Sequence, residues 1–196
     1  MQDKFFFKSK EFLIHPTVYG PREDSFLLAE SVKATKGSKV FDLGCGTGIQ
    51  GINALMQGAK KVVFADININ AVKCATTNAE TAGFAGKFEA VHTELFENIK
   101  GKFDGIVFNP PYVPSEEKKW ADTDGGEKGR EVLDVFLQEF PTHLKTDGGC
   151  FFLQSSLNGE KETAKILEER GFTGTIVARK GLFFEELIVF KAFKKQ

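Results

Sequence analysis

Short apolar segments alternate with segments of helical periodicity along most of this chain, and this alternation limits the possible folds more than any other feature. We predict strands at 39–44, 61–66, 87–93, 102–109, 148–155, 173–179 and 185–193. We predict helices at 22–34, 47–58, 70–83, 130–140 and 160–171. Strands separated by helices of this length form right-handed βαβ units on a parallel sheet. The sequence therefore predicts one α/β domain over residues 1–196, with residues 1–20 as a β-like or irregular lead-in.

Composition and charge exclude several classes of protein. The 196 residues carry a net charge of −1, so no overall basic field attracts nucleic acid or an anionic membrane. No apolar stretch reaches the roughly 20 residues that a membrane span needs. Cys45, Cys74 and Cys150 have no CxxC spacing and are odd in number, which argues against a disulfide framework or a self-contained zinc site. We therefore expect a cytoplasmic protein without a bound metal.

The segment DLGCGTGIQG, residues 42–51, joins the first predicted sheet strand to a helix. Its glycines allow a sharp turn and a close approach of a ligand to the backbone. Gly46-x-Gly48-x-x-Gly51 also satisfies the dinucleotide fingerprint, which keeps a nicotinamide cofactor open. Asp42 argues against that alternative, because a carboxylate aimed at the loop repels a pyrophosphate but suits a cationic sulfonium. Asp66 closes the next strand and can bind a ribose diol.

The third of the consecutive sheet strands ends in an acid with an apolar neighbour. Glu94 can accept a hydrogen bond from an adenine amino group, while Ile67 and Leu95 supply apolar faces for the ring. In open parallel sheets a ligand lies outside the carboxyl ends of the strands. These residues therefore predict an adenosyl site at the same edge as the glycine loop.

The segment FNPPYV, residues 108–113, ends the strand at 102–109 with a rigid corner. Two prolines fix the backbone and bring no N–H. The Asn109 side-chain oxygen and the Pro110 carbonyl can each accept one N–H of a planar amine or amide. Tyr112 can wall that group. The corner therefore favours transfer of a methyl group to a nitrogen. It leaves open whether that nitrogen belongs to a protein or to a nucleic-acid base.

Several motifs together give the chain a family resemblance. It resembles the HemK/PrmC-type release-factor glutamine methyltransferases, which are class I S-adenosylmethionine-dependent enzymes, and most of all their short archaeal and eukaryotic branch. The resemblance runs from Val18 almost to the end of the chain. The motifs that carry it are VYGPREDSFLL, DLGCGTG, FNPPYV, DGGEKGREVLDVF and EELIVFKAF.

The resemblance implies a three-layer Rossmann-like fold with a mostly parallel seven-stranded sheet and an antiparallel C-terminal strand. It implies that the cofactor is S-adenosylmethionine, bound by Tyr19, Ser25, Asp42, Gly44, Gly46, Asp66, Ile67, Glu94, Leu95 and Asn109. It implies that Asn109, Pro110, Pro111 and Tyr112 bind the substrate, with Asn109, Pro110 and Tyr112 as the catalytic residues. The implied substrate is the glutamine of the GGQ motif in a class I peptide chain release factor. The implied partner is a small zinc-binding activator protein on the edge strand 87–93.

Two other substrates remain open at this stage. NPPY motifs are shared with adenine N6 and guanine N2 methyltransferases of nucleic acids, and some eukaryotic relatives methylate lysine. The loop after Tyr112, residues 115–130, carries four basic and five acidic residues, which is unlike a track for phosphates. Trp120 in this loop could instead anchor a protein partner. The charges therefore favour a protein substrate and argue against stable binding of nucleic acid.

Overall fold

The computed structural model describes residues 3–115 and 123–195. Its helices are α1 (Glu23–Ser31), α2 (Ile49–Met56), α3 (Ile69–Thr81), α4 (Glu131–His143) and α5 (Glu160–Glu169), with a 3-10 turn η1 (Ser156–Asn158). Its strands are β1 (Asp3–Phe7), β2 (Lys10–Ile14), β3 (Lys39–Leu43), β4 (Lys61–Asp66), β5 (Phe88–His92), β6 (Phe103–Phe108), β7 (Leu144–Ser155), β8 (Phe172–Gly181) and β9 (Glu186–Lys194). Trp120, considered above as an anchor, lies outside the described residues.

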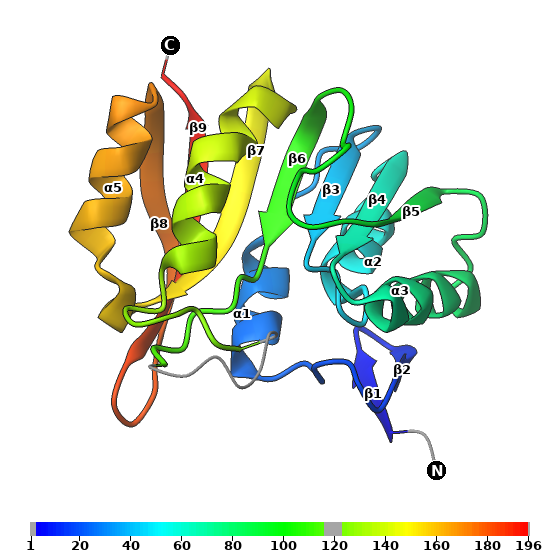
Figure 1. Cartoon of the computed structure of the whole chain (residues 1–196). Helices are drawn as coiled ribbons and strands as arrows, with labels where there is room; N and C mark the ends of the chain where they lie inside the picture. The colour runs from blue at the N-terminus through cyan, green and yellow to red at the C-terminus, as the bar shows by residue number, and fades with distance from the viewer. Residues whose placement is uncertain (1–2, 116–122, 196) are drawn as a thin grey trace.

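The main sheet has seven strands in the order β5-β4-β3-β6-β7-β9-β8 (Figure 1). The strands from β5 to β7 pair in parallel, whereas β9 runs antiparallel to both of its neighbours. The predicted fold is thus confirmed, including the antiparallel last strand. β5 lies at one edge of the sheet, as its lower apolar content predicted.

Helices cover both faces of the sheet and form two separate cores. Residues at alternate positions of a strand face opposite sides. Val40 accordingly belongs to the core that includes α1, α2 and α3, while the neighbouring Phe41 belongs to the core that includes α4 and α5. The α4 face is rich in phenylalanine, and the Phe136 ring lies 4.8 Å from that of Phe108 and 5.3 Å from that of Phe140. The central strands are therefore buried on both sides, and their carboxyl ends lie at one end of the molecule.

The lead-in segment forms a β-hairpin, β1–β2, in place of the irregular structure that the sequence left open. Its turn uses Lys8 and Ser9 at φ values of 47° and 64°. Asn78 of α3 fixes the hairpin, because its Oδ1 accepts from the Leu13 N–H at 2.8 Å and its Nδ2 donates to the Leu13 carbonyl at 2.9 Å. The same Nδ2 lies 2.9 Å from the Thr47 carbonyl in the glycine loop. The hairpin is therefore attached to the loop through one side chain.

Several boundaries differ from the predicted ones. α1 ends at Ser31 instead of continuing to 34, because Val32 has an extended ψ of 130°. α4 continues to His143 with Pro141 inside it, and β7 begins at Leu144 instead of 148. Among the helices of the described residues, none combines the length and the apolarity that crossing a bilayer requires.

Candidate functional site

The glycine loop lies at the carboxyl ends of β3 and β4. Gly46 has a φ of 52°, and a Cβ placed there would meet nothing closer than the Gly44 carbonyl at 4.0 Å, so this stretch of backbone is open to a ligand. Asp66 holds the loop against β4, with Oδ2 accepting from the Gly46 N–H at 3.0 Å and Oδ1 accepting from the Asn68 N–H at 2.8 Å. The structure therefore joins two of the predicted residues directly.

Asp42 lies beneath the loop and is fully buried. Its Oδ2 accepts from the Gly51 N–H at the start of α2, at 2.8 Å. Its Oδ1 has no hydrogen-bond partner among the described residues. Burial raises the pKa of this carboxyl well above its usual range, and the charge of Asp66 adds to the effect. Asp42 thus anchors the loop to α2 and leaves one carboxylate oxygen unsatisfied under it.

The ends of β4 and β5 meet as predicted. The Thr93 N–H donates to the Asp66 carbonyl at 3.0 Å, and the His92 Nε2 lies 2.8 Å from the Ile67 carbonyl. Ile67 is 57% exposed directly after β4. Glu94 is also exposed, and Leu95 is half-buried with a φ of 45°. An exposed isoleucine beside a carboxylate is suited to cover one face of a flat ring whose edge carries hydrogen-bond donors.

The NPPY corner directly follows β6. The Asn109 Nδ2 donates to the Asp24 Oδ2 at 3.0 Å, and the Asn109 Oδ1 is buried without a partner among the described residues. A buried acceptor without a donor costs about 1–3 kcal/mol, so this oxygen is available to a donor group of a ligand. Pro110 is buried, whereas Pro111 and Tyr112 are half-buried. The corner thus offers the acceptor that the sequence predicted. Asp24, which the sequence did not predict as a site residue, orients it.

Asp24 is a candidate site residue that the sequence reasoning missed. It lies in the first turn of α1, is 3% exposed, and accepts from the Ser25 N–H at 2.6 Å and the Ser25 Oγ at 3.1 Å. The hydroxyls of Tyr19 and Tyr112 lie 3.3 Å and 3.5 Å from its Oδ2. Burial raises the pKa of both tyrosines, and the Asp24 charge raises it further. One carboxylate therefore brings together Tyr19, Ser25, Asn109 and Tyr112.

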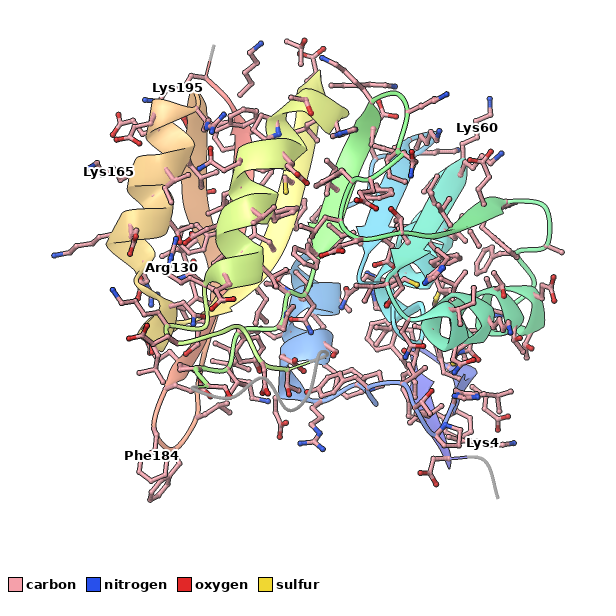
Figure 2. The ribbon with its side chains drawn as sticks, viewed as in Figure 1. Lys4, Lys60, Arg130, Lys165, Phe184 and Lys195 are labelled. Carbon is pink, nitrogen blue, oxygen red and sulfur yellow. The ribbon has the colours of Figure 1, made fainter. Side chains whose placement is uncertain are left out.

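A second group supports the corner from the opposite side. The Asn158 Nδ2 in η1 donates to the Tyr112 carbonyl at 2.9 Å and to the Lys128 carbonyl at 3.1 Å. Gly129 has a φ of 64°, and a Cβ there would collide with the Tyr112 carbonyl. Arg130, labelled in Figure 2, is buried and donates through Nη1 to the Asn158 carbonyl. The GGEKGREV segment thus fixes the corner through backbone contacts.

No group of three or more Cys, His, Asp and Glu residues is arranged to hold a metal ion within residues 3–115 and 123–195.

Comparisons with known proteins identify methyltransferases as relatives of this chain. Residues 11–183 match the family described as "Methyltransferase small domain". A protein of Methanocaldococcus jannaschii named "Putative protein N5-glutamine methyltransferase" is 46% identical over 187 residues, covering 92% of this chain and 94% of the relative. The human "Methyltransferase HEMK2" is 31% identical over 197 residues, covering 90% of each chain.

A solved structure agrees over nearly the same length. The E. cuniculi Mtq2–Trm112 complex, responsible for methylation of the translation termination factor eRF1, contains a chain with a TM-score of 0.75 and 29% identity. The match covers 91% of this chain and 99% of that one.

The sheet order, the glycine loop and the NPPY corner together define a methyltransferase with the class I fold. The chain belongs to the methyltransferase small domain family. The predicted class of enzyme, an S-adenosylmethionine-dependent methyltransferase of the HemK group, is thereby confirmed.

Proposed function

We propose that this protein transfers a methyl group from S-adenosylmethionine to the side-chain amide nitrogen of the glutamine in the GGQ motif of a class I peptide chain release factor. The observation that carries the proposal is the buried Asn109 Oδ1 at the carboxyl end of β6, an acceptor that has no donor among residues 3–115 and 123–195. The names of the M. jannaschii relative and of the eRF1-methylating complex support a glutamine substrate.

The residues around the glycine loop fit the cofactor. Asp66 would hold the ribose hydroxyls, the open backbone at Gly44 and Gly46 would admit the amino-acid part, and Ile67 and Leu95 would cover the adenine. Glu94 would accept from the adenine amino group. Tyr19, Ser25, Asp42 and Asn109 complete the cofactor set. When bound, the cofactor supplies an electrophilic methyl group on a cationic sulfonium, for which the surrounding carboxylates are suited.

The substrate amide would lie in the corner. An amide nitrogen is a poor nucleophile, because its lone pair is delocalised into the carbonyl. The Asn109 Oδ1 and the Pro110 carbonyl would each accept one of its N–H groups, which stabilises positive charge as it develops on the nitrogen. Pro111 offers no competing N–H, and Tyr112 would wall the amide plane. The nitrogen would gain the methyl group as the sulfur–methyl bond of the cofactor breaks, and it would lose one N–H proton to water.

Asp24 would set the direction in which Asn109 acts. An ionised carboxylate only accepts hydrogen bonds, so the Asn109 side chain must turn its NH₂ toward Asp24 and its oxygen toward the substrate. Asp24 thus acts as a positioning residue, and Asn109 and Pro110 contact the reacting group. Fixing the acceptor before the substrate arrives lowers the cost of positioning it.

The β5 edge would receive the activator protein. β5 pairs with β4 on one side and ends the sheet on the other, so it can extend the sheet by one strand of a partner. The solved relative in complex with Trm112 supports a small partner of this kind. We propose that the partner binds zinc and adds its strand at Phe88–His92.

The decisive experiment is methyl transfer from labelled cofactor to purified release factor, with and without a Gln→Ala change in its GGQ motif. We expect labelling of the unchanged factor alone, and its loss with the Asn109→Ala enzyme, whose affinity for S-adenosylhomocysteine should be largely kept. Matched reactions contain tRNA, rRNA or a lysine-bearing protein. Stronger labelling of any of these under the same salt conditions would contradict a glutamine substrate.

A further inference from the structure

The turn between β8 and β9 exposes three large apolar side chains. Leu182 is 39% exposed, Phe183 91% and Phe184 85%. The two phenylalanine rings contact each other edge to face, with centroids 4.5 Å apart, and so cover little of each other's surface. Leu157 in the adjacent η1 turn is 58% exposed. Single exposed apolar residues are common, but a group of four that includes two aromatics marks a candidate interaction surface.

This group, which we name the hairpin tip (Leu157, Leu182, Phe183 and Phe184), lies at the substrate end of the molecule. Figure 1 shows the β8–β9 turn projecting past the sheet at the end where β6 stops, and Figure 2 shows Phe184 at its extremity. The turn is closed by a hydrogen bond from the Leu182 N–H to the Glu185 carbonyl at 2.7 Å. The tip is therefore an ordered projection beside the candidate site.

Two hydrogen bonds connect the hairpin tip to the NPPY corner. The Glu186 N–H donates to the Ser156 Oγ at 3.0 Å, which fixes the base of the hairpin to η1. Asn158, two residues further along η1, donates to the Tyr112 carbonyl at 2.9 Å. The charge of Glu185 also raises the pKa of Tyr112, which places this acid within electrostatic range of the corner. The base of the hairpin and the NPPY corner are thus both held by the η1 turn.

We infer that the hairpin tip docks the body of the protein that presents the glutamine, by inserting Phe183 and Phe184 into an apolar hollow beside the substrate loop. This inference rests on the proposed function. Exposed aromatic anchors of this kind supply much of the affinity of protein interfaces. Because a glutamine side chain alone cannot reach the tip, the tip would select for a folded protein and leave the chemistry at Asn109 unchanged.

The charges around the tip favour a protein over a nucleic acid. Arg179 at the base of the hairpin is held by the carboxylates of Glu160 and Glu186, at 2.5 Å and 3.1 Å, so it is not presented to a phosphate. Glu185 adds a negative charge to the turn itself. Lys180 is exposed at the same end of β8, but a surface that tracked a phosphate backbone would need several such basic groups.

The test compares the wild type with the double variant Phe183→Ser/Phe184→Ser. Phe6→Ser serves as the matched control, since Phe6 is 70% exposed on the N-terminal hairpin. With release factor as substrate, we expect the double variant to raise KM about tenfold or more, while kcat and the affinity for S-adenosylhomocysteine stay within twofold. Phe6→Ser should change none of them. Calorimetry of release factor binding in the presence of S-adenosylhomocysteine should show the same loss of affinity.

The outcomes separate the two proposals. A wild type that labels no release factor would refute the proposed function, and the inference with it. A double variant with unchanged KM on a methylated release factor would refute the docking role alone. The docking role also fails if kcat or the affinity for S-adenosylhomocysteine falls while KM rises, because the tip would then be supporting the site itself.

Discussion

Replacing Asp24 by asparagine tests how the substrate corner is oriented. The wild-type carboxylate accepts from Ser25 through Oδ1 and from the Asn109 Nδ2 through Oδ2, at 3.0 Å in the latter case. An asparagine that keeps the Ser25 contacts turns its own NH₂ toward Asn109. Two donors then face each other. Asn109 must rotate its amide by 180°, and the NH₂ that results points at the substrate N–H in place of the acceptor.

The size of the effect follows from the hydrogen bonds lost. A hydrogen bond to a charged group contributes about 1.5–3 kcal/mol. Reversal of one acceptor should therefore lower kcat with release factor roughly 10- to 150-fold. Because the carboxylate also lies near Tyr19 and Ser25, which we propose to contact the cofactor, we expect S-adenosylhomocysteine affinity to fall by a smaller factor. Single-turnover methyl transfer and calorimetry measure the two quantities separately.

A reciprocal exchange distinguishes orientation from folding. In Asp24→Asn/Asn109→Asp the new amide donates to the new carboxylate, and the second oxygen of the carboxylate again faces the substrate. We expect this double variant to transfer methyl groups faster than either single variant. Asp104→Asn, at the opposite end of β6, controls for loss of a partly exposed carboxylate. Wild-type kcat in Asp24→Asn, or a double variant slower than both singles, would refute the reasoning.

Three further predictions concern the supports of the site. Burial raises the Asp42 pKa above its unfolded value of about 3.8, so the stability that this carboxyl contributes is lost as pH rises above 4. Asp42→Asn should therefore gain stability relative to the wild type by up to about 1.4 kcal/mol per pH unit in urea unfolding. A pH-independent difference between the two proteins would contradict this. Asn78→Ala should weaken S-adenosylhomocysteine binding and lower the unfolding free energy by about 1–3 kcal/mol, since the Thr47 carbonyl loses a donor. An unchanged affinity for S-adenosylhomocysteine in calorimetry would contradict this. Gly129→Ala should lower kcat/KM for release factor while sparing cofactor affinity, because the new Cβ displaces the Tyr112 carbonyl. An unaltered kcat/KM would count against the importance of that contact.

Much of the fold could be predicted from local sequence. β3 and β4 are runs of buried apolar residues that end in or next to an acid, and periodicity finds such runs directly. The ligand residues at their ends follow from a general property of parallel sheets, that their carboxyl ends meet at one edge. Asp66 and the Gly46 N–H accordingly lie in contact. The family resemblance added the antiparallel last strand, which periodicity alone does not give.

The residues that were missed act across long separations in the sequence. Asp24 lies 85 positions from Asn109, and Asn158 lies 46 positions from Tyr112. An acid in the first turn of a helix is ordinary, because it favours the helix dipole, so nothing local marks Asp24 as buried. The N-terminal hairpin escaped for a different reason. Its turn residues Lys8 and Ser9 adopt left-handed conformations without the glycine or asparagine that usually signals them.

The position of β9 in the sheet has a consequence for how the molecule opens. Within the described residues, β8 joins the sheet only through β9, which itself pairs with β7. Amides of β8 can therefore exchange with solvent deuterium while β9 stays paired, but β9 cannot open without releasing β8. Hydrogen exchange of the native protein should show this order, with faster exchange in β8. Since the β8–β9 turn carries Phe183 and Phe184, fraying of β8 would loosen the proposed docking surface before it disturbs the glycine loop on the other side of β6.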